Sequence, residues 1–389
     1  YIVAGYRSAI GKAKKGGFRF YRPDDLAADV VKHLVASVPN LDPSRIDDLI
    51  CGNAIPEAEQ GMQIGRMIVL RAGLPLSVGG VTVNRYCASG LETIAMATAK
   101  IKAGMAECII AGGVESMSLL PMTGWRTVLN YGIASTTPDY YSSMGLTAEA
   151  VAQQYGISRE DQDLFSFNSH QKAIAAIESG KFKDEIVPVT VEEVYLQNNK
   201  RKTRSFVVDT DEGPRKDTTV EGLAALKAVF AAKGSVTAGN LSQTSDGAAF
   251  VLVMSEKMVK ELNIEPIARL VTSAVVGCEP RIMGIGPVVA IPQALKQAGL
   301  KLDDIEMIEL NEAFAAQALA CIRQWNLDDR DERINPNGGA IAIGHPLGMS
   351  GARIILTAAH QLTLTKKQYA LCTMCIGVGQ GYAVIIERC

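Results

Sequence analysis

Short apolar runs alternate along this chain with segments in which apolar residues recur at helical spacing, and parts of this pattern occur twice. At residues 46–52 and again at 305–311, an acidic turn leads into an apolar segment that is typical of a buried strand. Helices rich in Ala, Ile and Thr are predicted to open at Ser89 and at Ser350. Both pairs therefore suggest the same order of elements.

A third pair of segments keeps this order. Residues 108–113 and 371–377 each indicate a strand followed by a glycine turn, and all three pairs are offset by about 260 residues. Collinear matches of this kind predict a duplicated alternating α/β unit. We expect a first half over residues 1–262 and a second half over residues 263–389.

The region at about 119–235 differs in composition from the rest of the chain, because it contains paired tyrosines and a charged stretch. We therefore expect an inserted loop domain within the first half. Inside it, residues 147–154 and 158–179 have helical spacing, and Ser158 begins a Ser-x-x-Asp capping box. The short basic run Lys200–Lys202 is expected in a solvated loop.

Composition narrows the class of protein. With 389 residues, 48% hydrophobic and 21% charged, the chain can bury a large core, and its net charge of −2 predicts no nucleic-acid partner. No apolar run approaches the length of a membrane span, so we expect no membrane insertion. Eight scattered cysteines favour a reducing compartment and a cytoplasmic location. Because the chain starts without Met, an organelle reached through a removed leader stays open.

Cys87 is the first candidate for chemistry. It follows the apolar alternation of residues 81–83 and precedes a helix with small residues in its first turn, which predicts a strand-to-helix turn. Free backbone N–H groups and the helix dipole favour a thiolate at such a place. The alternative is a buried structural cysteine.

His345 lies in a glycine-rich run over residues 335–348. Gly344 and Pro346 flank it, with Pro346 just inside a predicted helix start, and we expect this turn to point the imidazole outward. The other histidines are interpreted as structural or surface residues: His33, His170 and His360.

Cys375 is followed by Gly377, Gly379 and Gly381. Alternate glycines allow a bent backbone that presents N–H groups to an oxyanion, although they also mark tight exits from strands. The polar pair Asn311–Glu312 ends a predicted buried strand, where it is suited to hold a water or a carbonyl.

Four motifs together resemble the thiolase family across nearly the whole chain. They are Cys-Ala-Ser-Gly at 87, Asn-Glu-Ala-Phe-Ala at 311, Gly-His-Pro-Leu-Gly at 344 and Cys-x-Gly-x-Gly at 375. The resemblance implies an α/β fold with five αβαβα layers, built from two similar βαβ halves with an inserted loop domain.

The resemblance also implies an acyl transfer between thiols. Cys87, activated by His345, would attack a 3-ketoacyl-CoA and carry the acyl group as a thioester. Cys375 would protonate the departing acetyl-CoA enolate and later deprotonate CoA. One oxyanion hole would consist of His345 with a water held by Asn311, and the other of the N–H groups of Cys87 and Gly377.

Coenzyme A is the implied co-substrate, with no permanently bound cofactor and no metal. Positions that match the family's CoA-binding residues are Arg215, Ser242, Met144 and Ser143. Ser143 departs from the His that many short-chain biosynthetic thiolases carry there.

Two further segments, residues 56–61 and 214–219, resemble the degradative branch of the family. We therefore expect thiolytic cleavage of 3-ketoacyl-CoA to acetyl-CoA and a shortened acyl-CoA in fatty acid β-oxidation. The alternative within the family is an acetoacetyl-CoA thiolase that condenses two acetyl-CoA.

Other classes fit less well. Condensing ketosynthases lack a second catalytic cysteine such as Cys375, and carrier-type proteins on a thiolase scaffold depart from the motif that residues 311–314 retain. A non-catalytic lipid-binding protein is therefore the least favoured interpretation. The resemblance implies a homodimer or homotetramer, and leaves a β-oxidation multienzyme partner open.

Overall fold

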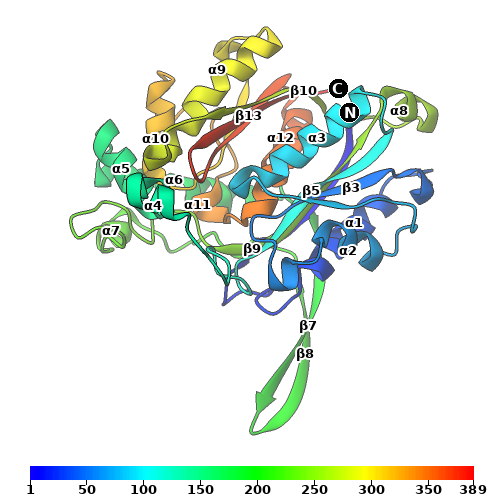
Figure 1. The fold of residues 1–389 in the computed structure, drawn as a ribbon, viewed down its shortest axis with the longest axis horizontal. Helices are drawn as coiled ribbons and strands as arrows, with labels where there is room; N and C mark the ends of the chain where they lie inside the picture. Colours follow the sequence, from blue (N-terminus) through cyan, green and yellow to red (C-terminus); the bar gives the residue numbers. More distant parts are fainter.

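The computed structural model describes residues 1–389 and contains two large β-sheets separated and flanked by helices (Figure 1). The first sheet has the strand order β4-β3-β5-β9-β1-β6, with β2 paired to β9. Its strands are β1 (Ile2–Ser8), β2 (Gly11–Lys12), β3 (Asp48–Gly52), β4 (Val81–Val83), β5 (Cys108–Ser116), β6 (Ile186–Val187) and β9 (Ser245–Met254).

The second sheet repeats the core of the first. Its order is β10-β13-β12-β11, formed by β10 (Arg269–Gly277), β11 (Met307–Leu310), β12 (Tyr369–Ile376) and β13 (Gln380–Glu387). In both sheets one parallel pair, β3 with β5 or β11 with β12, continues into two antiparallel pairs. A single parallel bridge between Ile308 and Ile334 takes the place of β4. The predicted duplication is confirmed by this topology.

Helices complete a five-layered arrangement. α1 (Pro23–Ala36) and α2 (Ile64–Arg71) cover the outer face of the first sheet, and α9 (Gly286–Ala298) and α10 (Ala315–Gln324) cover the outer face of the second. Between the sheets lie α3 (Ser89–Lys102) and α12 (Leu347–Thr365), whose apolar side chains share one core with both inner sheet faces. The predicted α/β fold with αβαβα layers is confirmed.

The two central helices touch at their first turns. A Cβ on Gly90 would lie 2.5 Å from the Ala352 nitrogen, and one on Gly351 would lie 2.2 Å from the Leu91 nitrogen. Only glycine permits this approach of backbones, because any side chain would collide with main-chain atoms. The contact brings the residues that precede α3 close to those that precede α12.

The region between β5 and β9 holds most of the remaining structure. Its elements are α4 (Tyr131–Thr136), α5 (Met144–Tyr155), α6 (Arg159–Glu178), β7 (Val189–Gln197), β8 (Lys200–Val208) and α7 (Val220–Ala224). α5 and α6 confirm the two predicted helices, and the Ser158 hydroxyl accepts a hydrogen bond from the Asp161 nitrogen, 3.0 Å away, as the N-cap. Elsewhere lie α8 (Glu256–Leu262), α11 (Ala340–Ile343) and the 3₁₀ turns η1 (Pro43–Arg45), η2 (Ala58–Gln60), η3 (Tyr86–Ala88), η4 (Pro138–Tyr141), η5 (Pro280–Ile285) and η6 (Leu302–Asp304).

The basic run Lys200–Lys202 lies on β8, so the prediction of a loop was wrong. β7 and β8 form a two-stranded antiparallel hairpin that projects from the body (Figure 1). Asn198 and Asn199 join the strands with φ values of 51° and 57°, the left-handed conformation that tight hairpins require. The asparagines fix the turn, while buried residues alternate with exposed ones at the base of β7, where Val189 and Val191 join the core.

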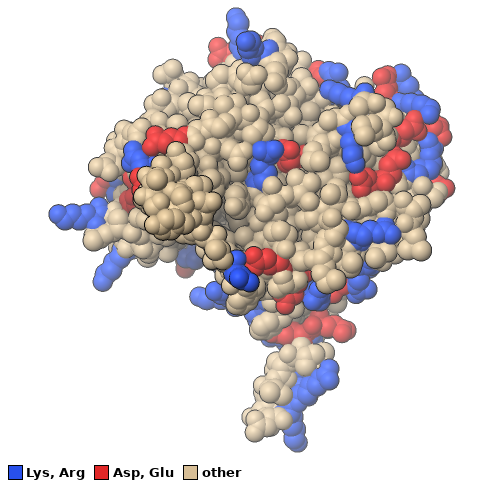
Figure 2. Space-filling model, viewed as in Figure 1, with Lys and Arg blue, Asp and Glu red and all other residues tan.

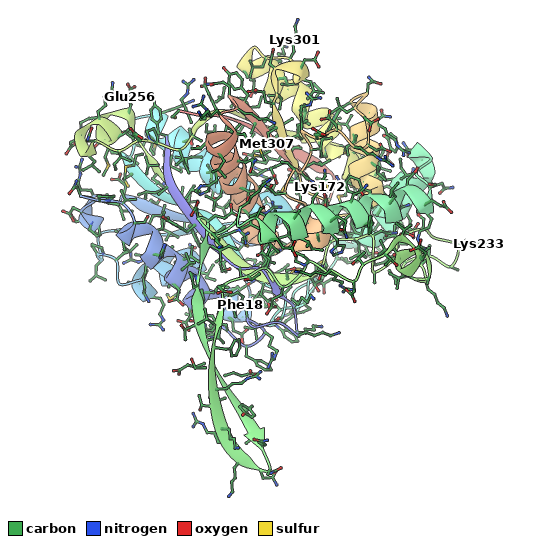
Figure 3. The ribbon with its side chains drawn as sticks, turned by 180° about the vertical axis from the view of Figure 1, so that it is seen from behind. Phe18, Lys172, Lys233, Glu256, Lys301 and Met307 are labelled. Atoms are coloured by element: carbon green, nitrogen blue, oxygen red, sulfur yellow. The ribbon has the colours of Figure 1, made fainter.

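Charges of both signs are spread over the surface, and Lys and Arg side chains extend along the hairpin (Figure 2). From behind, α6 crosses the molecule as a long helix that carries Lys172 (Figure 3). Among the helices of the structure, none has both the length and the apolar character needed to cross a bilayer.

Candidate active site

Cys87 lies in η3, between β4 and α3, as the strand-to-helix prediction requires. The Ser89 hydroxyl accepts a hydrogen bond from the Arg85 nitrogen at 2.9 Å and donates one to the Tyr86 carbonyl at 2.7 Å, which fixes the turn. Tyr86 has a φ of 45°, a strained conformation for an aromatic residue. The turn thereby holds the half-buried Cys87 at the start of α3.

The Cys87 thiol is protonated near neutral pH. Burial raises its pKa to about 11, although the backbone N–H groups of Gly377 and of Cys87 itself oppose this shift by stabilising the thiolate. The N–H groups thus act in the direction that the sequence predicted, but desolvation by burial outweighs them. Reaction at Cys87 needs a base that removes its proton.

His345 directly precedes Pro346, which is the N-cap of α12 and lies just outside the helix, so the helix begins one residue later than predicted. Its side chain is only 4% exposed, so the expected outward orientation was wrong. Burial, with the Arg353 charge as a smaller cause, lowers the pKa of His345 to about 3. The imidazole is therefore neutral at pH 7, and the same burial makes it a weaker proton acceptor than a free imidazole.

Two polar side chains hold the ring. Nε2 of His345 lies 3.3 Å from Nδ2 of Asn311, and Nδ1 lies 2.6 Å from Oγ of Ser350. Leu347, two residues further on, packs in the same small apolar cluster as Cys87. The imidazole thus lies at the junction of the two halves, and no sequence pattern pointed to the role of Ser350.

Gln243 fixes the backbone around His345, and sequence reasoning missed it. Its main-chain carbonyl accepts a hydrogen bond from the His345 nitrogen at 3.2 Å. Its side-chain amide donates to the carbonyls of Gly213, Ile341 and Ala342 at 3.0, 3.2 and 3.1 Å. The Gln243 side chain thus links the loop that precedes Arg215 to α11, and its main chain holds His345.

Cys375 is the penultimate residue of β12 and is 1% exposed. Burial, followed by the charge of a nearby Cys87 thiolate, raises its pKa well above the ordinary value for a thiol. The chain then reverses into β13 through Val378 and Gly379, whose φ values are 67° and 85°. This turn places the Gly377 N–H at the Cys87 thiol.

Asn311 follows β11, as predicted, and its Oδ1 is buried without a hydrogen-bond partner. The adjacent Glu312 is tied down, because its carboxylate accepts hydrogen bonds from Ser169 at 2.6 Å and from Asn335 at 2.8 Å. Since buried polar atoms are normally paired, the free Oδ1 marks a place for a hydrogen-bond donor from water or substrate.

The residues expected to contact coenzyme A do not all lie at the same depth. Met144 opens α5 and packs against the cluster that contains Cys375, while Ser143 is the exposed N-cap of that helix. Ser242 donates its backbone N–H to the Ala313 carbonyl at 2.9 Å, which places it beside the Asn311 segment.

Arg215 lies further out and is exposed. Its backbone N–H donates to Nδ1 of His170 at 3.2 Å, so this buried histidine supports the Arg215 loop. A structural interpretation of His170 agrees with this contact. The guanidinium remains on the surface, where a large polar ligand can reach it.

The sequence matches two family models, described as the thiolase N-terminal domain over residues 1–257 and the thiolase C-terminal domain over residues 264–388. A 3-ketoacyl-CoA thiolase of Bacillus subtilis (strain 168) is 50% identical over 389 residues, covering 100% of this chain and 99% of the relative. A β-ketoadipyl-CoA thiolase of Acinetobacter baylyi is 49% identical over 404 aligned positions, with the same coverage.

Among solved structures, the Bacillus anthracis acetyl-CoA acetyltransferase superimposes with a TM-score of 0.89 at 38% identity, covering 100% of this chain and 98% of that one. The fold and the sequence both match thiolases along the full length of the chain. This chain therefore belongs to the thiolase family of acyltransferases, enzymes that act on thioesters of coenzyme A.

Proposed function

We propose that this thiolase cleaves 3-ketoacyl-CoA with CoA to give acetyl-CoA and an acyl-CoA shortened by the acetyl unit. The observation that carries the proposal is the pair of thiols in one site, with the Gly377 N–H directed at Cys87 and with Leu347, two residues after His345, packed against Cys87. The transfer of an acyl group from 3-ketoacyl-CoA to the CoA thiol needs one group to hold the acyl chain and another to move protons.

In the first half of the cycle, Nε2 of His345 takes the Cys87 proton and the thiolate attacks the 3-keto carbonyl. The N–H groups of Cys87 and Gly377 stabilise the oxyanion. The carbon–carbon bond breaks, acetyl-CoA leaves as an enolate, and Cys375 gives its proton to the enolate carbon. The raised pKa of Cys375 suits a proton donor.

In the second half, the Cys375 thiolate takes the proton of the incoming CoA thiol, and the CoA thiolate attacks the acyl thioester on Cys87. The expelled Cys87 thiolate recovers its proton from His345, so all protons balance. In the first half, His345 with a water at Asn311 stabilises the charge that develops on the thioester oxygen of the departing acetyl-CoA enolate. Both cysteines return to their starting state.

Coenzyme A would be held along the loops beside the thiols. Arg215 offers a planar cation to adenine or phosphate, and Ser242 offers its hydroxyl to the pantetheine arm. Met144 and Ser143 would line the approach to Cys375. These roles place recognition outside the two sheets.

Mass spectrometry after incubation with acetyl-CoA tests the covalent step. We expect an acetyl group on Cys87 that disappears when free CoA is added. A protein that turns over 3-ketoacyl-CoA without ever carrying an acyl group on Cys87 would contradict the mechanism.

We further propose that the degradative direction, in β-oxidation, is the physiological one. Ser143, where short-chain biosynthetic enzymes often carry His, and the name of the Bacillus subtilis relative support this choice. The second candidate, an acetoacetyl-CoA thiolase, is favoured by the structural match to an acetyl-CoA acetyltransferase.

The comparison of kcat/KM for acetoacetyl-CoA, a long-chain 3-ketoacyl-CoA and 3-oxoadipyl-CoA separates these candidates. We expect the long-chain substrate to be cleaved most efficiently. A preference for acetoacetyl-CoA would favour the second candidate, and a preference for 3-oxoadipyl-CoA would assign the activity named for the Acinetobacter relative.

A further inference from the structure

Ser350 contacts the Nδ1 side of the His345 ring, whereas Asn311 contacts Nε2. It lies in the first turn of α12 and is 2% exposed. Its Oγ is 2.6 Å from Nδ1 of His345 and 2.8 Å from the carbonyl oxygen of Pro346, to which the hydroxyl donates. The hydroxyl is thus shared between the ring and the helix start.

The hydrogen inventory of these groups selects one state of the ring. A serine hydroxyl has a single hydrogen, and here it goes to the Pro346 carbonyl, so Oγ is left to accept from Nδ1–H. At the other ring nitrogen, the Asn311 amide is oriented with Nδ2 toward Nε2, and in this orientation Nδ2 donates and Nε2 accepts. Both contacts require the same tautomer, with the hydrogen on Nδ1.

We propose that Ser350 is a positioning residue that holds His345 in the Nδ1–H tautomer, so that Nε2 is the nitrogen that receives the Cys87 proton. This inference rests on the proposed function of His345 as the base. It gives Ser350 the part that a carboxylate plays in Ser-His-Asp enzymes, where loss of the correct tautomer is costly.

The charges around the ring explain why a hydroxyl suits this position. Arg353, one turn further along α12, is paired with Glu309 of β11 at 3.0 Å, and its charge disfavours an imidazolium. From β5, the Glu115 carboxylate accepts the Gly348 N–H at 2.9 Å. Ser350 orients the ring without adding a charge, and its hydroxyl can polarise when Nε2 takes a proton.

Nuclear magnetic resonance tests the tautomer in the unmodified enzyme. The chain has only 4 histidines, so ¹⁵N-histidine labelling gives few signals, and the His345→Gln variant identifies the one that matters. We expect a protonated Nδ1 and an unprotonated Nε2 for His345 at neutral pH. A proton on Nε2 in place of Nδ1 would overturn the proposal.

The Ser350→Ala variant tests the consequence for chemistry. Removing a group that orients a functional histidine typically costs about 10- to 100-fold, and we expect that loss in the rate of Cys87 acetylation, with KM for acetyl-CoA unchanged. The labelled His345 signal should become a mixture of tautomers. Ser350→Thr, which keeps the hydroxyl, should restore both the rate and the single tautomer.

Ser166→Ala is the matched control. Ser166 is buried in α6 and its hydroxyl donates to the Gln162 carbonyl at 2.7 Å, the same bond to the fourth preceding residue but away from His345. We expect acetylation to be unaffected in this variant. Equal losses in the two alanine variants would reduce Ser350 to a structural residue and refute the inference.

His345→Ala separates this inference from the proposed function. If His345→Ala acetylates Cys87 at the normal rate, the proposed base is wrong. If His345→Ala is slow and Ser350→Ala is normal, only the role of Ser350 fails. Should Ser350→Ala not fold, the tautomer measured in the unmodified enzyme still decides.

Discussion

The starts of α3 and α12 occupy equivalent places in the two halves, yet they present different chemistry. Each helix follows the edge of its sheet, after β4 in the first half and after the Ile334 bridge in the second. Cys87 precedes α3, whereas His345 precedes α12. The two halves thus contain equivalent helix starts, and a different residue type precedes each one: a cysteine before α3 and a histidine before α12.

Burial differs between these two places as well. Cys87 is half-buried and its neighbour Tyr86 is exposed, while His345, Asn311 and Cys375 are each at most 4% exposed. Under the proposed mechanism an acyl chain must reach Cys87, and the first half leaves that turn open. The groups that move protons gain from exclusion of water, and the second half encloses them.

The largest effect is expected at the helix start of the first half. Cys87→Ser replaces the thiol with a far poorer nucleophile, and loss of a nucleophile costs on the order of 10⁴- to 10⁶-fold in kcat. No acetyl adduct should form with acetyl-CoA. Circular dichroism serves as the control for folding. If the variant still gained an acetyl group at this position at the normal rate, the helix start of the first half would not supply the nucleophile.

A smaller loss is expected at Cys375, on the closing turn of the second half. Cys375→Ser should lower thiolysis by about 10²- to 10⁴-fold, the usual contribution of a general acid and base. Acetylation of Cys87 by acetyl-CoA should largely survive, and mass spectrometry can follow it. Full thiolysis by this variant would show that the second half does not supply the proton donor.

Lowering the pH should reduce the free energy of unfolding through two buried histidines. They are His345 in the second half and His170 in the inserted region. Burial lowers their pKa values to about 3 and about 4, against about 6.5 in an unfolded chain. The unfolded state then binds more protons below pH 6.5. The free energy of unfolding should therefore fall with pH, by up to about 1.4 kcal/mol per pH unit for each ring, until pH approaches the folded pKa.

Denaturant melts between pH 7 and pH 3 measure this slope. His345→Gln should flatten it over a wider pH range than His170→Gln, because the pKa of His345 is lowered further. Identical slopes in the unmodified protein and both variants would contradict the assignment of buried neutral rings.

The smallest effect is expected at Arg215, which lies on the surface away from the two helix starts. Arg215→Ala should raise KM for CoA by about 5- to 10-fold, in line with roughly 1 kcal/mol for an exposed charged contact, and leave Cys87 acetylation at saturation unchanged. Lys216→Ala, an adjacent exposed cation paired with Glu178, is the control. A drop in kcat with normal KM would instead tie Arg215 to catalysis.

Local patterns predicted much of this molecule. The strands β3, β5, β11 and β12, the helices α3, α5 and α6 and the internal repeat all follow from the apolar pattern, which depends on neighbours in sequence. The turns at Cys87 and Cys375 follow from small residues that permit sharp bends. The motif order then indicated the family.

Properties set by long-range packing could not be predicted in the same way. The direction of the His345 ring and the raised pKa of Cys87 depend on burial at the junction of two halves that are far apart in sequence. Ser350 and Gln243 matter through partners that only the folded chain brings together. The domain boundary after residue 262, the oligomeric state, a multienzyme partner and the location in the cell stay predictions.

The strand orders also constrain how the protein is made. β9 lies between β5 and β1, and β13 lies between β12 and β10, so in each sheet the strand synthesised last is an interior one. Neither sheet can close while its final strand is still within the ribosome. A nascent chain that stalls before β9 or before β13 would expose unpaired strand edges, and each half would become a client for chaperones until that strand emerges.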